Sequence, residues 1–212
     1  MRFCCIDPGF VNFGISIEEF DDDAIPAFTG KRYLRDRLPT AEFKAFLYKH
    51  IYYNGMLLFY KRVDISPDDG KFSSNIIQSM IKLTAFFDSI RGQLDKCDAF
   101  FVERQLRVNP YASKIESHCY SYFSMMYGES RVISDISAAD KYSYLGCEHR
   151  LTKHKRKKWA TTTCLSILEC RKDEKTIVDL ISNCRKGRKK KLDDISDTVI
   201  MCQVMKVKLF TF

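Results

Sequence analysis

The stretch FCCIDPGFVNFGISI, residues 3–17, holds two short apolar runs separated by a turn. This pattern predicts a β-hairpin, in which Gly9 and Gly14 permit a tight turn and a close approach of other backbone. The first run ends in Asp7, which has no basic residue beside it in the sequence. Burying an unpaired carboxylate costs about several kcal/mol, so we expect Asp7 to have a partner from elsewhere in the chain.

The composition is that of an ordinary globular protein. The chain has 212 residues, of which 45% are apolar and 13% aromatic, and we expect a single domain over residues 1–212 with a possible insertion within 18–75. No apolar run approaches the roughly 20 residues of a membrane span, and a strand so near the N-terminus leaves no room for a targeting peptide. We therefore expect no membrane partner.

The cysteines indicate the redox environment. There are nine, an odd number, and no two have the C-x-x-C spacing of a metal or redox motif. Several lie in apolar runs, so we expect free and mostly buried thiols rather than a disulfide framework or a zinc site. This usage is typical of a reducing, intracellular compartment.

Strand-like and helix-like segments alternate along the rest of the chain. Residues 40–62 begin as a helical pattern and end as a strand-like one. We expect further strands near 31–36, 98–105 and 130–137, and helices near 74–97, 110–127, 157–170 and 174–184 and from 192 onward. Strands separated by helices after an initial hairpin predict an α/β fold with a mixed sheet.

Acidic residues recur at the ends of the predicted elements. Glu103 ends a second apolar strand, as Asp7 ends the first. In the last helix Asp194 and Asp197 lie three residues apart beside an apolar stripe, whereas Asp193 is four residues from Asp197, so the spacing alone does not choose between Asp193 and Asp194. Two strand acids and a helical pair would form a cluster of four carboxylates. Such clusters bind Mg²⁺ or Mn²⁺, and two ions about 3.5–4 Å apart can drive phosphodiester cleavage. The ions would be the missing partner of Asp7.

The positive charge is concentrated in two blocks. The net charge is +8 and the isoelectric point about 9.0, and the blocks KHKRKK (153–158) and RKGRKKK (185–191) carry much of the surplus. Such blocks neutralise the phosphates of nucleic acid, although a single block is also typical of a solvated loop or a localisation signal. The residues expected to bind DNA are Lys153, Lys155, Arg156, Lys157, Arg185, Lys186, Arg188, Lys189 and Lys190.

These motifs together resemble a known family. The opening IDPGFVNFGIS is similar to the first strand, turn and strand of RuvC-type Holliday junction resolvases in the RNase H-like superfamily. The segments FVERQLRVNPY and KKLDDISDTVIMC resemble the poxvirus-type resolvases in particular, in which an E-R-Q strand end and an L-D-D-x-x-D helix recur. The resemblance spans residues 3–205. It implies an RNase H-like mixed sheet with an antiparallel N-terminal hairpin and helices on both faces.

The resemblance also implies an activity. The family members are homodimeric, Mg²⁺-dependent nucleases that place paired symmetric nicks across a four-way DNA junction. By position, the catalytic and metal-binding acids would be Asp7, Glu103, Asp194 and Asp197. A lysine in the helix before the last acids would be Lys158, with Lys157 as the alternative. The setting would be a large DNA virus that resolves recombination and concatemer junctions in the host cytoplasm.

Three other functions fit parts of the pattern. An RNase H-like enzyme that cuts RNA–DNA hybrids would share the acids but need no dimer. A non-catalytic junction-binding protein would need the fold but would gain nothing from carboxylates aimed at phosphate. An actin-like or sugar-kinase-like ATPase would need a second domain and a phosphate loop, so we expect no nucleotide cofactor.

Overall fold

The structure is a computed structural model of the chain. It describes residues 1–9, 11–36, 38–68, 75–106, 108–147, 151–185 and 192–211. The side chains of Lys153, Asn183, Cys184, Arg185 and Asp193 also fall outside the description. The DNA-binding predictions for Lys153, Arg185, Lys186, Arg188, Lys189 and Lys190 therefore lie outside the described residues.

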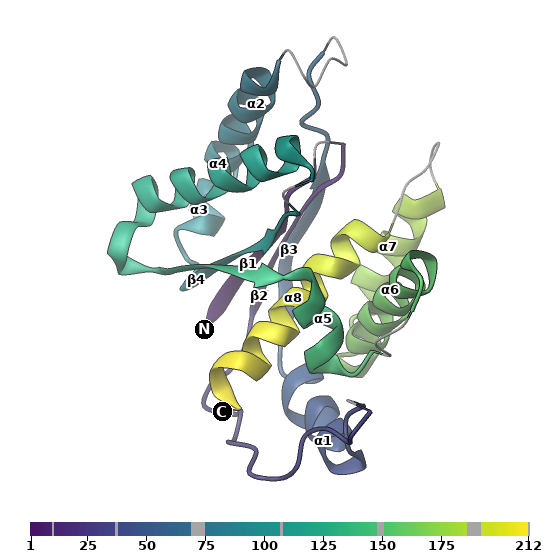
Figure 1. Ribbon diagram of the computed structural model, residues 1–212. Helices are drawn as coiled ribbons and strands as arrows, with labels where there is room; N and C mark the ends of the chain where they lie inside the picture. Colours follow the sequence, from purple (N-terminus) through teal and green to yellow (C-terminus); the bar gives the residue numbers. More distant parts are fainter. Residues whose placement is uncertain are drawn as a thin grey trace.

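A five-stranded mixed sheet forms the centre of the molecule, in the order β3-β2-β1-β4-β5 (Figure 1). The N-terminal hairpin pairs β1 antiparallel with β2, and β2 pairs antiparallel with β3. The other half is parallel, because β4 pairs with β1 and β5 pairs with β4. The strands are β1 (Arg2–Asp7), β2 (Phe13–Glu19), β3 (Met56–Val63), β4 (Ala99–Arg104) and β5 (Val132–Ser137).

Helices cover both faces of this sheet (Figure 1). One face carries α2 (Ile76–Ser89), α3 (Arg91–Leu94) and α4 (Pro110–Tyr127), and η2 (Gly128–Ser130) follows α4. The other face carries α5 (Ala138–Leu145), α6 (Lys153–Cys170), α7 (Glu174–Arg185) and α8 (Asp193–Phe210). The predicted α/β architecture, with its antiparallel hairpin and helices on both faces, is confirmed.

The alternation of side chains along β1 divides the core into two layers. Phe3 and Cys5 pack on the α8 side, whereas Cys4 and Ile6 pack on the side of α2 and α4. All four side chains are completely buried. This double burial explains why the strand is an unbroken apolar run, as expected for a central strand covered on both faces.

The segment 18–75 supplies both sheet and helix. Its strand β3 is an edge strand of the sheet, and α1 (Ala41–Phe46) continues into the π-helix η1 (Leu47–Tyr52). Phe43, Leu47 and Ile51 bury their side chains in the same core layer as α8. These two helices lie at the end of the molecule opposite to the first turn of α8 (Figure 1).

Three predicted elements need correction, and one helix was missed. Residues 31–36 form no strand and contribute only a single bridge between Tyr33 and Pro39. The helix expected over 74–97 is interrupted at Ile90, which separates α2 from α3. The helix expected from residue 157 begins at Lys153, because Thr152 caps it through the backbone N–H of Lys155. Helix α5 was not predicted at all.

Candidate active site

The sheet brings the two strand acids together. Strands β1 and β4 are parallel neighbours, and Ile6 lies opposite Val102 in their register. Asp7 and Glu103 each follow directly, so both carboxylates stand at the same end of adjacent strands. Glu103 is buried as a residue, and Asp7 is half-buried. The sequence prediction that these acids converge is thus met by the register of the sheet.

Helix α8 adds its acids at the same end. Gly14 is the register partner of Asp7 on β2. A Cβ atom on Gly14 would lie 2.8 Å from the backbone oxygen of Asp194, which is closer than real Cβ atoms come to any heavy atom. Glycine at this position therefore lets the first turn of α8 rest on the hairpin beside Asp7. Asp197, one helical turn later, extends the acidic group toward Glu103.

A lysine that the sequence reading missed lies among these carboxylates. The Nζ atom of Lys141 is 3.0 Å from Oε2 of Glu103 and 3.3 Å from Oδ2 of Asp197. The residue is only 2% exposed. It stands in α5, whose first turn follows β5 directly and is capped by the Ser137 hydroxyl, which accepts from the backbone N–H of Ala139. The sequence did contain one signal for it, because Lys141 lies one helical turn after the end of β5, the strand beside β4.

The titration of these groups reflects their proximity. Burial raises the pKa of Asp7 well above its ordinary value, and the nearby charges of Glu103 and Asp197 raise it further, while Lys141 opposes the rise. Burial by itself would lower the pKa of Lys141, but Glu103, Asp197 and Asp7 outweigh burial and hold its pKa above the usual lysine range. The four groups therefore form one electrostatic unit.

The donor set of this unit fits a hard divalent cation. Carboxylate oxygens are the ligands that Mg²⁺ and Mn²⁺ prefer, and the mutual repulsion that raises the pKa of Asp7 is what a bound cation would relieve. Among the described residues, no three acidic, histidine or cysteine side chains are already arranged around one point as ligands. In this arrangement the ammonium group of Lys141 supplies the positive charge between Glu103 and Asp197.

The first basic block lies on α6, next to this unit. The guanidinium of Arg156 stacks over the ring of Tyr142 at 5.6 Å, and Tyr142 directly follows Lys141 in α5. Burial raises the pKa of Tyr142, and the charge of Asp197 raises it further. Lys155 and Lys158 are exposed on α6 and Lys157 is half-buried. The structure thus puts the charged start of α6 beside the acids, with Lys141 rather than Lys158 in contact with them.

Comparison of the sequence with known proteins finds a viral relative. No family model matches the chain. Among curated proteins, the uncharacterized protein 97L of Invertebrate iridescent virus 3 is 32% identical over 123 residues, which span 58% of this chain and 55% of that protein. The chain therefore matches about half the length of this relative.

Solved structures match over nearly the whole chain. The fowlpox virus Holliday junction resolvase superposes with a TM-score of 0.54 at 16% identity, covering 99% of this chain and all of the other. The chain has the Holliday junction resolvase fold. In the complex of the fowlpox enzyme with its junction DNA, the match covers both chains completely with a TM-score of 0.60 at 15% identity. The yeast mitochondrial Holliday junction resolvase matches at 0.56 and 13% identity over 96% of this chain and 78% of its own.

Proposed function

We propose that this protein is a structure-selective DNA endonuclease that resolves four-way junctions by paired symmetric nicks. The observation that carries the proposal is the buried group of Asp7, Glu103, Asp197 and Lys141 at one end of the sheet, beside a basic helix. The group occurs in a fold shared with resolvases of a poxvirus and of yeast mitochondria. One of those poxvirus structures holds Holliday junction DNA as its substrate, which supports the same substrate here.

The acids would act as ligands and the lysine as a fixed cation. Asp7, Glu103, Asp194 and Asp197 would hold Mg²⁺ or Mn²⁺, with two ions per site, and such ions supply an activated water and stabilisation of the leaving oxygen. Lys141 holds Glu103 and Asp197 in place through its two ion pairs. Its ammonium would also stabilise negative charge that develops on the scissile phosphate, as preorganised cations do. Lys158, with Lys157 as its alternative, stays the prediction for a second lysine contact with phosphate.

The basic residues would bind the DNA backbone. The first turns of α6 carry Lys155, Arg156 and Lys157. The second block, 185–191, directly precedes α8 in the chain. Contacts of this kind give salt-sensitive affinity that is largely independent of sequence. Selectivity for a junction would come from shape, because a two-fold symmetric homodimer presents two sites at a fixed separation.

The biological setting follows from the relatives. A curated match from an invertebrate iridescent virus and a structural match from fowlpox virus favour a role in viral DNA recombination and concatemer processing. The proposed place of action is the host cytoplasm at sites of viral DNA replication. Among the described residues, no helix is both long enough and apolar enough to cross a membrane.

Cleavage of labelled DNA tests the proposal. A synthetic four-way junction, a linear duplex and an RNA–DNA hybrid are incubated with the protein, with and without Mg²⁺. We expect metal-dependent nicks in the junction alone, and we expect Asp7→Asn to abolish them while still binding the junction. Asp140→Asn is the matched control, because Asp140 neighbours Lys141 in α5 but its carboxylate pairs with Lys208 at 3.0 Å.

Each other outcome assigns a different function. Cleavage of the hybrid in preference to the junction would replace the proposal with an RNase H-like activity. Tight junction binding without cleavage by any divalent ion would indicate a non-catalytic junction-binding protein. Equal loss of cleavage in Asp140→Asn and Asp7→Asn would remove the argument from the acid group.

A further inference from the structure

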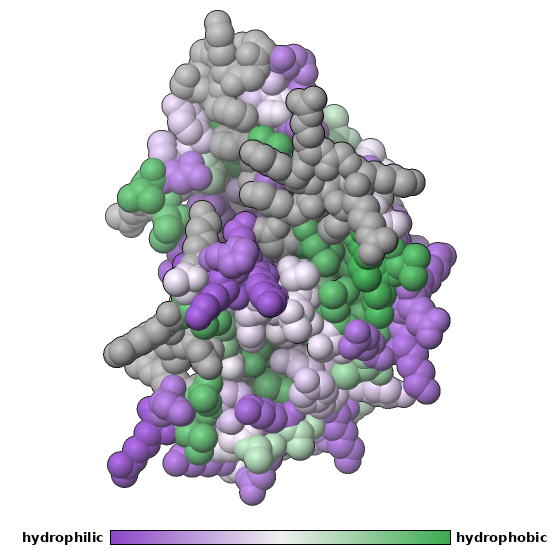
Figure 2. All heavy atoms as spheres, turned by 90° about the vertical axis from the view of Figure 1, so that its right-hand side faces the viewer, coloured by the Kyte–Doolittle hydropathy of each residue, from purple (hydrophilic) through white to green (hydrophobic). Residues whose placement is uncertain are grey.

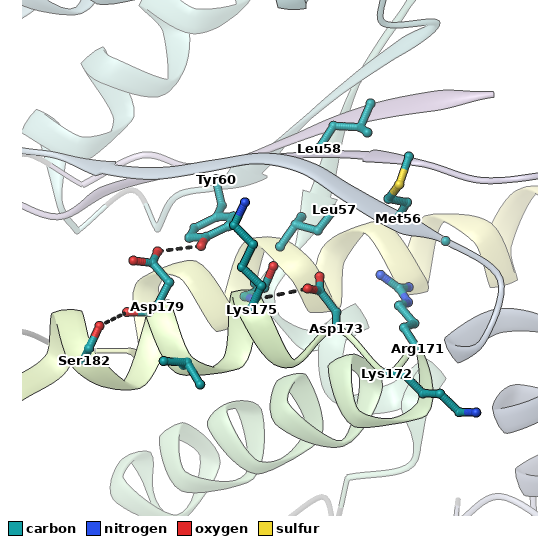
Figure 3. Close-up of a pocket in the computed structure, with 13 residues that line it drawn as sticks. Met56, Leu57, Leu58, Tyr60, Arg171, Lys172, Asp173, Lys175, Asp179 and Ser182 are labelled. Carbon is teal, nitrogen blue, oxygen red and sulfur yellow. Dashed lines mark hydrogen bonds between the residues drawn. The ribbon is translucent and has the colours of Figure 1, made fainter.

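A groove runs between the edge strand β3 and helix α7, away from the acids. It has a volume of about 920 Å³ and is lined by β3 residues that include Leu57 and Tyr60 and by one face of α7. Arg171 lies at one end, in the turn between α6 and α7, and Ser182 lies at the other (Figure 3). Figure 2 shows the side of the molecule on which α6 and α7 lie, where hydrophobic side chains gather among hydrophilic ones.

The wall of the groove at Arg171 contains a buried excess of positive charge. Glu18, which is fully buried, accepts hydrogen bonds from Nη2 of Arg171 at 2.8 Å and from Nζ of Lys206. Gln203 donates to the same carboxylate at 2.8 Å. Two basic side chains therefore share one carboxylate in an almost completely buried region, and burial lowers the pKa of Lys206. Burying an uncompensated charge is unfavourable, so an additional anion near this network would be stabilised.

Arg171 has donor capacity left over. Its side chain is only 4% exposed, and its Nε atom donates to the backbone oxygen of Tyr52 at 2.7 Å. Its Nη1 atom makes no hydrogen bond with any described residue. A buried guanidinium nitrogen without a partner costs about 1–3 kcal/mol or more, which an anionic acceptor would offset. In Figure 3 the guanidinium points from the turn toward β3, across the groove.

The rim of the groove has the same charge preference. Lys172 and Lys175 are exposed and form no ion pair with any described residue. The two carboxylates of the groove are already engaged, because Asp173 accepts from the backbone N–H of Thr176 and Asp179 accepts from the hydroxyl of Tyr60 at 2.5 Å. Because those donors are neutral, both carboxylates keep their charge, and the lining carries three cations against two carboxylates, a net charge of +1.

We propose that this groove is an anion-binding site that receives the phosphodiester backbone of one arm of the DNA substrate. The inference rests on the proposed function and adds a DNA contact outside the group of acids. In the sequence, only the basic segment 185–191 separates α7, which forms one wall of the groove, from α8, which carries Asp194 and Asp197.

The dimensions and lining of the groove suit a nucleic acid strand. Within α7, Ser182 lies eight residues after Glu174, and a rise of 1.5 Å per helical residue gives about 12 Å of groove wall, which is room for about three phosphates of one strand at about 3.4 Å each. The half-buried ring of Tyr60 and the exposed side chain of Val178 offer apolar surface for a sugar or a base.

The slope of log K for junction binding against log salt concentration is proportional to the number of phosphates that the protein contacts. Binding of a fluorescent junction by the Asp7→Asn background is followed by anisotropy from about 50 to about 200 mM salt. If Lys172 and Lys175 each contact one phosphate of a duplex arm, the double variant Lys172→Gln/Lys175→Gln lowers the magnitude of the slope of log K against log salt by about 1.8. The matched control is Lys44→Gln/Lys49→Gln, which removes the same charge from exposed positions on α1 and η1 that do not line the groove.

The outcomes separate this inference from the proposed function. A lower slope in the groove variant with an unchanged slope in the control supports the groove as a DNA contact. Equal slopes in the background protein and the groove variant overturn it, and so do equal reductions in both double variants, which would reflect net charge alone. Failure of the background protein to bind a junction at all overturns the proposed function as well.

Discussion

Replacing Lys141 by methionine tests the electrostatic unit at the acids most sharply. Methionine keeps an unbranched apolar stem of similar length but removes the ammonium between Glu103 and Asp197. Because Lys141 is 2% exposed, its loss would leave three carboxylates without the buried cation that lies among them. Removing one partner of a buried ion pair costs about 3–5 kcal/mol. We expect Lys141→Met to lower the free energy of unfolding at neutral pH by that amount in the absence of metal.

The matched control is Lys208→Met. Lys208 pairs with Asp140 at 3.0 Å, but the two side chains are 31% and 25% exposed, and such pairs contribute about 0–1 kcal/mol. Urea unfolding followed by circular dichroism measures both variants in EDTA. At about 2–4 °C per kcal/mol, Lys141→Met should also lower Tm by about 6–20 °C, and added Mg²⁺ should restore more of its stability than that of the wild type.

The pH dependence of this variant gives an independent check. The folded pKa of Lys141 lies above its unfolded value, so its stabilisation is present below the ordinary lysine pKa and is lost only as the pH rises through the folded pKa. Without Lys141 the acids should bind protons more tightly, so the loss in Lys141→Met should shrink as the pH falls. Equal losses for Lys141→Met and Lys208→Met, or a loss independent of pH, would refute the reasoning.

Three further predictions follow from the same structure. Because the folded pKa of Asp7 is raised, its protonated form stabilises the fold, so metal-free stability should fall as the pH rises from the ordinary aspartate pKa through the folded one; Asp7→Asn should flatten that part of a pH series of urea titrations. In Gly14→Ala the new Cβ would lie 2.8 Å from the backbone oxygen of Asp194, so we expect the first turn of α8 to shift, the cleavage rate to fall and the fold to lose about 1–3 kcal/mol of stability. Gly92→Ala is the control, because a Cβ there meets nothing within 4 Å, and it should change neither quantity. Equal effects of the two variants would contradict the packing argument. Asn109 caps α4 by accepting from the backbone N–H of Ala112, so Asn109→Ala should lower Tm at a cost of about 0.5–2 kcal/mol without a change in cleavage.

The strand acids were predictable from the sequence because the relevant physics is local. An apolar run that ends in Asp7 or Glu103 predicts a buried strand with an acid at its end. Parallel pairing of the two strands then places the two acids side by side. The sequence spacing did not predict whether Asp193 or Asp194 would lie beside Gly14. That choice depends on how α8 crosses the hairpin, which no local pattern encodes.

Lys141 was missed for the same physical reason. Its segment, AADKYSYL, has no strong apolar stripe, so periodicity gave no reason to expect a helix there. The helix forms because Ser137 caps it and because α5 packs against α8. A buried lysine is favourable only beside carboxylates that come from other elements, and those contacts span 38 residues to Glu103 and 56 to Asp197. The basic run at 153–158 was more conspicuous, but its side chains at 154, 155, 156 and 158 are exposed.

The central claim is that two symmetric sites cut one junction together. A supercoiled plasmid that extrudes a cruciform tests this most directly, because two paired nicks in one binding event linearise the circle, whereas a single nick relaxes it and removes the cruciform. With Mg²⁺ present, the account predicts linear product from the start of the reaction and none with Asp7→Asn. Nicked circle as the sole product, or intact plasmid under every divalent ion, would contradict it.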